Sequence, residues 1–346
     1  ALSYPRRRWK IDPTEFQFSY TVLKGSWVPL GDHESGRFTY PGIGSAIKTY
    51  DPGLIITGGF SVATMKLWLR SLAKPTRYLI WSGAIHRHGQ PDPAWSRWQR
   101  RLLIKRSTGC IAYGTTARDY LIEHGAAPSR VTVAINTVDT SFYQRESVAI
   151  RSKQKADTVP RFLYVGNLEK GKRLDSLIAA IRILDKTNRP FLIDIVGDGS
   201  QRSSLQKDVV RLGLDSRFVF HGHQQKEDVV RYLAQAQAFL FPSDYDIWGL
   251  VVVEAMAAGL PCISSIRAGV TKDLVHDGIT GFAVNFDDHA LVASKMEWLM
   301  DHPTERSQMG QEAARIIANH ATIPRSAAAF VEAIRAALKP LPPRGN

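Results

Sequence analysis

The stretch FPSDYDIWGLVVVEAMAAGLPCISS, residues 241–265, contains the end of a buried strand, a polar loop, a helix and a second strand in immediate succession. An apolar run ends at Phe241 and gives way to the loop PSDYDIWG. LVVVEAMAAG then reads as a helix that ends at Gly259, before Pro261, and the apolar run CISS follows. Strand, loop, helix and strand in this order form the repeating unit of a parallel sheet covered by helices. The stretch therefore predicts an α/β fold.

The same alternation of short apolar runs and helical patterns extends over most of the 346 residues, a length that favours two domains over one. The polar segment 147–160 separates two such series and predicts a linker. We therefore expect an N-terminal domain over 1–146, a C-terminal domain over 161–322, and a last helix and tail over 323–346. In the N-terminal domain, strands are expected to begin at Gly53, Arg77, Cys110 and Val131, and helices to cover 62–72, 94–106 and 116–125.

The beginning of the chain does not show the buried strand, glycine loop and helix with which a nucleotide-binding domain opens. The first residues, ALSYPRRRWKID, are polar and rich in arginine, and no Met precedes them. We expect the N-terminal domain to lack its first strand-helix unit in this chain, and the sequence to be the trimmed remainder of a longer protein.

The composition is that of a globular protein and excludes collagen-like, disordered and disulfide-scaffold classes: 44% of residues are hydrophobic, 22% are charged and 26 are glycines. No apolar run reaches the roughly 20 residues that cross a bilayer. Cys110 and Cys262 each lie in a strand-like segment and are expected to be buried and reduced. These features predict a cytoplasmic protein.

Positive charge is concentrated in the first half of the chain. The formal net charge is +13, and residues 1–150 hold 20 Lys and Arg against 10 Asp and Glu. Here AWSRWQRRLLIKR, from Ala94, predicts a helix with two rows of side chains: Trp95, Trp98 and Leu102 in one, and Arg97, Arg101 and Lys105 in the other. Two interpretations stay open for this helix. It is either an ordinary amphipathic helix packed on the sheet, or a basic, aromatic surface that lies on anionic lipid.

Two carboxylates of the opening stretch lie beyond the carboxyl ends of the predicted strands, where open α/β sheets bind their ligands. Asp246 is in the loop and Glu254 is in the helix, eight positions later, so both can face one ligand. Gly249, at the helix start, allows a phosphate to approach the backbone closely. Alternatively, the pair is an acid that favours the helix dipole and a solvated glutamate. Glu254 argues against this alternative, because an acid in so apolar a stretch requires a hydrogen-bonding partner.

PSDYDIWGLVVVEAMAAGLPCISS resembles the E-x7-E region of glycosyltransferase family 4, with Asp246 at the position of the first glutamate and Glu254 at that of the second. GNLEKGKRLDSLIAAI, from Gly166, resembles the family's G-R-L-x-x-x-K-G segment. VGDG and TKDLVHDGITGFAV resemble its further motifs, and the resemblance covers roughly residues 105–290. It implies the GT-B fold, in which two Rossmann-like, doubly wound domains face each other across a cleft.

The resemblance also implies roles for individual residues. Glu254 is expected to bind the ribose hydroxyls of a UDP- or GDP-linked sugar, which is a co-substrate and not a cofactor. The diphosphate is expected to be held by Lys172 and by the first amides of the helix. Those amides belong to Gly249, Leu250 and Val251, and the turn that contacts the base contains Gly222, His223 and Lys226.

The sequence departs from the family pattern at two positions. Asn167 stands where the family often has a phosphate-binding arginine, and Asp246 is one methylene shorter than the usual glutamate. Asn167 is kept as a candidate donor-binding residue, and Lys170 or Arg173 could supply the missing charge.

In the N-terminal domain, WSGAIHRHGQPDP follows a predicted strand and supplies His86 and His88 as candidates for acceptor contact or for proton transfer near neutral pH. We take His86 as catalytic, together with Lys172 and Asp246. No dedicated nucleophile is expected, because retaining transfer in the family is thought to proceed on the donor's own face. No group of His, Asp or Cys has the spacing of metal ligands, so no bound metal is expected.

The resemblance, together with the basic first half, implies a retaining hexosyltransferase that acts in the synthesis of cell-surface polysaccharide or glycolipid, with a glycan or lipid-linked acceptor and no nucleic acid partner. The basic first half predicts a peripheral position on the inner face of the membrane. Two alternatives stay open. One is a non-catalytic basic module on a degenerate GT-B fold that binds nucleotide, glycan or nucleic acid. The other is a GT-B epimerase or phosphorylase, although the extra acids or lysine anchor that these enzymes need are not evident.

Overall fold

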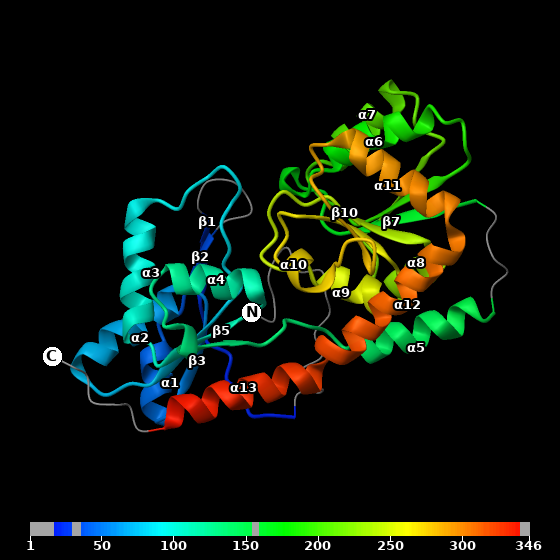
Figure 1. The fold of residues 1–346 in the computed structure, drawn as a ribbon. Coiled ribbons are helices and arrows are strands. Elements are labelled where there is room, and N and C mark those ends of the chain that lie inside the picture. The colour runs from blue at the N-terminus through cyan, green and yellow to red at the C-terminus, as the bar shows by residue number, and fades with distance from the viewer. Residues whose placement is uncertain (1–16, 30–35, 154–158, 340–346) are drawn as a thin grey trace.

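The computed structural model describes residues 17–29, 36–153 and 159–339 and shows two α/β lobes side by side (Figure 1). Each lobe is built around a parallel sheet, as the alternation of apolar runs predicts. The helices are α1 (Ile43–Tyr50), α2 (Val62–Ala73), α3 (Ala94–Arg106), α4 (Thr115–Glu123), α5 (Thr140–Arg151), α6 (Leu174–Asp185), α7 (Arg202–Arg211), α8 (Lys226–Gln235), α9 (Leu250–Ala257), α10 (Thr271–Leu274), α11 (His289–Asp301), α12 (Pro303–His320) and α13 (Ile323–Leu338).

The second lobe contains a six-stranded parallel sheet with the strand order β12-β11-β10-β7-β8-β9. This is the doubly wound order in which the chain starts in the middle, moves to one edge and then returns to build the other half. The strand order reverses between β7 and β10, and ligands of such sheets bind at this point. The strands are β7 (Arg161–Val165), β8 (Leu192–Val196), β9 (Phe218–Gly222), β10 (Ala238–Phe241), β11 (Cys262–Ser265) and β12 (Gly281–Val284).

Apolar residues fill both faces of this sheet, because successive side chains of a strand point to opposite sides. Phe162 and Tyr164 of β7 face one core, which α6, α7 and α11 cover. Leu163 and Val165 face the other core, which α5, α8, α9 and α12 cover. Burial on both faces explains why these strands read as continuous apolar runs in the sequence.

The first lobe contains a four-stranded parallel sheet in the order β3-β4-β5-β6, covered by α2, α3 and α4 on one face. Helix α13, red in Figure 1, returns from the second lobe and covers the other face with residues such as Phe330 and Ala333. An antiparallel pair precedes the sheet, and within the described residues no parallel strand comes before β3. The strands are β1 (Ser26–Pro29), β2 (Gly36–Thr39), β3 (Ile55–Gly58), β4 (Tyr78–Ser82), β5 (Gly109–Ala112) and β6 (Val131–Val133).

Three sequence expectations can be compared with these elements. The predicted strands and helices of the first half are confirmed to within a few residues. Helix α5 covers 140–151 and therefore enters the expected linker 147–160, so the domain boundaries stay predictions. Cys110 and Cys262 are both buried and free.

Helix α3 forms as expected, but its tryptophans do not pack on the sheet. Trp95 is 59% exposed and Trp98 is 65% exposed, whereas Ser96, Leu103 and Ile104 form the buried face. Among the helices of the described residues, none combines the length and the apolar character that crossing a bilayer requires.

Candidate functional site

Lys172 and Asp246, two of the three residues expected to be catalytic, lie against each other where the chain reverses between β7 and β10. Lys172 ends a short turn after β7, and Asp246 lies in the β10–α9 loop, residues 242–249. The Lys172 Nζ is 2.7 Å from Asp246 Oδ2, and the two side chains are 22% and 20% exposed. Asp246 Oδ1 accepts a hydrogen bond from the Trp248 amide at 3.1 Å. Asp246 thus holds the ammonium group at the edge of the crevice, where an anion can reach it.

Helix α9 begins beside this ion pair and directs its N-terminus at the same crevice. Gly249 precedes the helix with φ 103°, and a Cβ at this position would lie 2.9 Å from Phe241 Cε1. Glycine is therefore required here on two grounds, backbone conformation and space. The first amides of a helix have no acceptor within the helix, so those of Leu250 and Val251 are available to an anion.

Glu254 is buried inside α9 and has the partner that its apolar surroundings require. The side chain is 8% exposed, and it pairs with the Tyr143 hydroxyl of α5. Burial raises the pKa of Glu254 to about 7, although the Tyr143 hydrogen bond and the charge of Lys226 act in the opposite direction. The predicted ribose-binding carboxylate is thus held by a residue from the first half of the chain.

Lys226 lies near Glu254, although the sequence grouped it with the turn that follows β9. Its Nζ is 4.0 Å from the centroid of the Phe142 ring and 5.6 Å from that of Tyr143. Stacking on two rings fixes the position of the cation. Tyr143 and Phe142 were missed because the strand-to-helix segment NTVDTSFY carries no charge pattern that links it to a glutamate far along the chain.

The remaining predicted donor residues lie in two other turns. Gly222 ends β9 with φ 73°, and His223 follows it, half-buried, with its Nε2 3.4 Å from Gln225 Nε2. Asn167 is exposed after β7, and its carbonyl accepts a hydrogen bond from the Tyr164 hydroxyl at 2.8 Å. Strand β9 forms the edge of the sheet, two strands away from β7, so the structure does not bring these two turns together.

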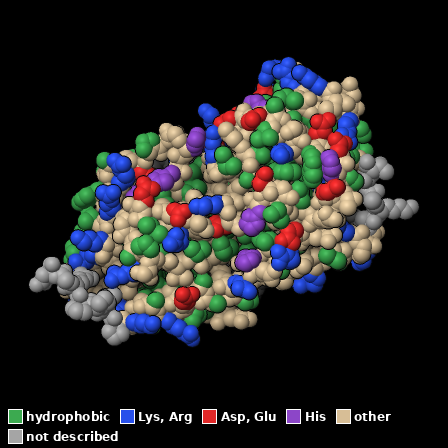
Figure 2. Space-filling model, viewed as in Figure 1, with side chains coloured by type: hydrophobic (Ala, Val, Ile, Leu, Met, Phe, Trp, Pro, Cys, Tyr) green, Lys and Arg blue, Asp and Glu red, His purple; other side chains and the backbone are tan. Residues whose placement is uncertain are grey.

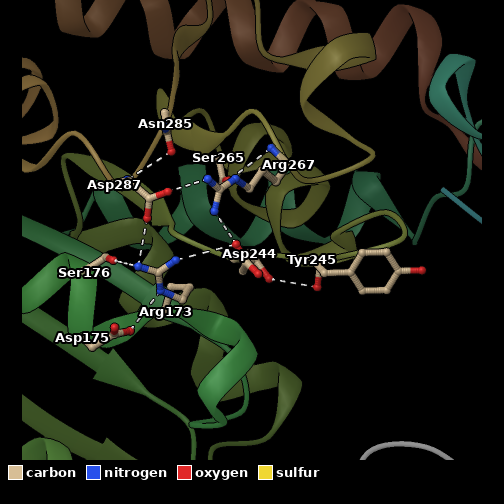
Figure 3. Close-up of polar contacts among 10 residues, drawn as sticks. Arg173, Asp175, Ser176, Asp244, Tyr245, Ser265, Arg267, Asn285 and Asp287 are labelled. Carbon is tan, nitrogen blue, oxygen red and sulfur yellow. Dashed lines mark hydrogen bonds and ion pairs between the residues drawn. The ribbon is translucent and has the colours of Figure 1, made fainter. Parts of the chain in front are cut away.

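Arg173, one of the two cations considered as a substitute for the missing arginine, is already held by aspartates (Figure 3). It adopts φ 50°, and its guanidinium group lies 3.0 Å from Asp287 and 3.7 Å from Asp244. Arg267 pairs with the same two aspartates and lies 2.5 Å from Asp287. This network ties together the loops that follow β7, β10, β11 and β12. Lys170, the other candidate, is exposed.

The β10–α9 loop also contacts the first domain on both sides of Asp246. The guanidinium carbon of Arg87 lies 4.7 Å from the centroid of the Tyr245 ring. Trp248 is buried against Gly114, where an added Cβ would lie 2.1 Å from the indole Cζ3. The loop that carries Asp246 is therefore part of the contact between the two domains.

His86 has carboxylate partners that the sequence did not reveal. Its Nε2 is 2.8 Å from Glu123 Oε2 on α4, and its Nδ1 is 3.9 Å from Asp92 Oδ2. Asp92 also accepts a hydrogen bond from the Tyr120 hydroxyl at 2.6 Å and lies 2.5 Å from Arg100. Burial raises the pKa of Asp92, but the hydrogen bonds from Arg100 and Tyr120 outweigh it and hold the pKa below its usual value. The imidazole thus lies between two carboxylates, which suits proton transfer.

A cavity of about 470 Å³ connects the His86 group to the second domain. The first domain lines it with residues 85–89 and one face of α4, and the second domain contributes residues 266–268. Two polar contacts join the two domains beside the cavity: the Thr115 amide donates to Asp273 at 2.9 Å, and Lys272 lies 2.8 Å from Asp119. The volume lies in the range of roughly 300–1,000 Å³ that small-molecule sites occupy.

Figure 2 shows histidine side chains on the visible surface of both lobes, and Lys and Arg side chains along the outer edge of the first lobe. Among the described residues, no three His, Cys, Asp or Glu side chains are grouped so that they could hold a metal ion.

Comparison with known proteins identifies the relatives of this fold. Residues 146–316 match the family described as glycosyl transferases group 1. The α-D-kanosaminyltransferase of Streptomyces kanamyceticus is 27% identical over 228 residues, which are 64% of this chain and 58% of that protein. The chain thus spans little more than half the length of this curated relative.

Solved structures share the two-domain architecture. A glycosyltransferase from Rickettsia africae superimposes with a TM-score of 0.72 at 16% identity, over 86% of this chain and 80% of that one. Anabaena Alr3699/HepE, solved in complex with UDP and glucose, gives a TM-score of 0.70 at 18% identity, over 86% and 82%. The chain therefore has the GT-B fold, and its residues 146–316 match the model of the glycosyl transferases group 1 family.

Proposed function

We propose that the chain is a retaining hexosyltransferase that moves a hexose from a UDP- or GDP-linked sugar to a glycan or lipid-linked acceptor. It acts in the synthesis of cell-surface polysaccharide or glycolipid. One observation carries this proposal: Lys172, the N-terminus of α9 and the buried Glu254 lie at the point where the sheet reverses its strand order. The names of the relatives, a kanosaminyltransferase and a protein solved with UDP and glucose, support the same class of donor.

The proposed reaction breaks the bond between the anomeric carbon and the diphosphate oxygen, and it forms a bond from the acceptor oxygen on the same face of the sugar. The ribose hydroxyls donate to Glu254. Lys172 and the α9 amides stabilise the negative charge that develops on the departing diphosphate. Because these groups supply positive potential at that place, we propose that transfer requires no bound metal.

The acceptor lies in the cavity beside His86 in this proposal. The acceptor hydroxyl loses its proton as the new bond forms, and His86, oriented by Glu123 and Asp92, receives or relays this proton. A diphosphate oxygen of the donor assists on the other side. We place the enzyme in the cytoplasm, peripheral on the inner face of the membrane, where a lipid-linked acceptor is available.

A thermal-shift screen of UDP-, GDP-, ADP- and dTDP-sugars, with and without added Mg²⁺, tests the donor class. We expect one class of nucleotide to raise the melting temperature of the chain, equally with and without the metal. Release of nucleotide diphosphate with an acceptor panel then tests transfer, and NMR of the product's anomeric carbon tests retention.

A second candidate is a non-catalytic module on a degenerate GT-B fold. Arg173 favours it, since this candidate substitute for the missing arginine is held by Asp244 and Asp287. Nucleotide binding without release of diphosphate from any donor and acceptor pair would favour this candidate over the transferase.

A further inference from the structure

The exposed surface of α3 combines aromatic and basic side chains that the proposed transfer chemistry does not use. Trp95 and Trp98 are 59% and 65% exposed, and Leu102 completes their row on the helix. Arg97, Arg101 and Lys105, all exposed, form a neighbouring row at spacings of four residues. Tryptophan normally contributes a large buried area to a core, so two indoles in water on one helix require a partner.

The charge around these rows has one sign. Helices α2 and α3 contain Lys and Arg but no Asp or Glu. Some of the cations have internal roles, such as Arg100, which pairs with Asp92, and Arg106, which donates to Ser71 on α2. The row of Arg97, Arg101 and Lys105 is exposed and can contact an external partner. Figure 2 shows Lys and Arg interleaved with hydrophobic side chains along the edge of the first lobe where Figure 1 draws α2 and α3.

The neighbouring helix α2 also carries exposed aliphatic side chains. Leu69 and Leu72 of α2 are each 53% exposed. Leucine fits the acyl region of a bilayer, whereas a nucleic acid offers stacked bases and phosphates to aromatic and basic groups. Exposed indoles, leucines and cations together are the composition of a surface that lies in a membrane interface, where indoles sit at the level of the headgroups.

The position of the surface next to the cavity connects it to the substrate. The loop that carries His86 and Asp92 leads directly into α3, and Trp95 lies in the first turn of the helix. We propose that α3, through Trp95, Trp98, Arg97, Arg101 and Lys105, docks the first domain on an anionic bilayer and so presents the cavity to an acceptor in that bilayer. The acceptor part of this inference rests on the proposed function, but the docking part does not.

Sedimentation with vesicles tests the docking surface. The chain is mixed with vesicles of phosphatidylcholine alone or of phosphatidylcholine and phosphatidylglycerol in equal parts. We expect binding only to the anionic vesicles, weakened at least about tenfold in the double variants W95S/W98S and R97Q/R101Q. The matched control K207Q/V210S removes an exposed cation and an exposed apolar side chain from α7 of the second domain, and we expect it to bind like the wild type.

Three results would overturn the inference. The first is equal sedimentation of the wild type and both α3 variants. The second is binding of a single-stranded oligonucleotide that α3 variants lose while vesicle binding persists. The third is a dimer, detected by light scattering, that dissociates in W95S/W98S. Calorimetric titration of the same preparations with UDP and with GDP separates this proposal from the donor site. Binding of either nucleotide without vesicle binding refutes the docking surface alone, and vesicle binding without binding of either nucleotide refutes the donor site alone.

Discussion

The buried carboxyl group of Glu254 makes the stability of the chain depend on pH in a calculable way. Its pKa is about 7 in the folded chain against 4.5 for the unperturbed group. The folded state therefore keeps the proton over a range in which the unfolded state releases it. The associated stability is fully present below about pH 4.5 and is lost as the pH rises to about 7, at about 1.4 kcal/mol per pH unit, or about 3 kcal/mol in total.

The variant Glu254→Gln removes this titration and keeps the shape of the side chain. Urea denaturation of both proteins at about pH 5.5 and about pH 8 isolates its contribution, since other groups titrate equally in both. We expect the free energy of unfolding of the variant, relative to the wild type, to increase by about 2 kcal/mol between these two values. Glu332→Gln, an exposed position on α13, is the control and is expected to show no pH-dependent difference.

The same carboxyl group should release a proton when the donor binds. Ribose hydroxyls donate to the ionised form, so binding of a nucleotide sugar lowers the pKa of Glu254. Calorimetry at about pH 6 in buffers of different ionisation enthalpy measures this release. An equal stability difference at both pH values, together with no proton release, would refute the assignment of a high pKa to Glu254 and of the ribose to its carboxylate.

The other predictions concern groups around Glu254 and across the cleft. Lys172→Met should lower kcat/KM by at least about a hundredfold, because the cation that stabilises the leaving diphosphate is lost, whereas the exposed control Lys207→Met on α7 should have little effect in the same assay. Gly249→Ala should lower the free energy of unfolding by about 1–3 kcal/mol in urea titrations, because the backbone is at φ 103° and Phe241 occupies the space; an unchanged midpoint contradicts this. His86→Gln should lower kcat by about a hundredfold or more with KM for the donor unchanged, and an unaltered kcat rules out its role in proton transfer.

The second domain was more accessible to sequence reasoning than the first. The alternation of its strands and helices along the chain and the positions of Lys172, Asp246 and Gly249 follow from local features: apolar runs, turns after strands, and a glycine before a helix. The contact between Lys172 and Asp246 could be expected because both follow strands whose carboxyl ends meet at one edge of the sheet.

Contacts between distant segments were not accessible in the same way. Tyr143 reaches Glu254 from a helix of the first half of the chain, and Glu123 is separated by 37 positions from His86. Neither partner has a local pattern that marks it. Helix α3 shows a different limit: periodicity defined two rows of large side chains, but the face that packs on the core is formed by Ser96, Leu103 and Ile104, which belong to neither row.

Calorimetric titration with nucleotide diphosphates tests the central claim, that Glu254 forms part of a nucleotide-sugar site, most directly. UDP, GDP, ADP and dTDP are titrated into the wild type, Glu254→Ala and the control Glu332→Ala, all at about pH 8. We predict that one nucleotide binds the wild type and the control equally, and binds Glu254→Ala at least about tenfold more weakly, since hydrogen bonds to a charged group are worth about 1.5–3 kcal/mol. Equal affinity of the wild type and Glu254→Ala for every nucleotide would contradict it.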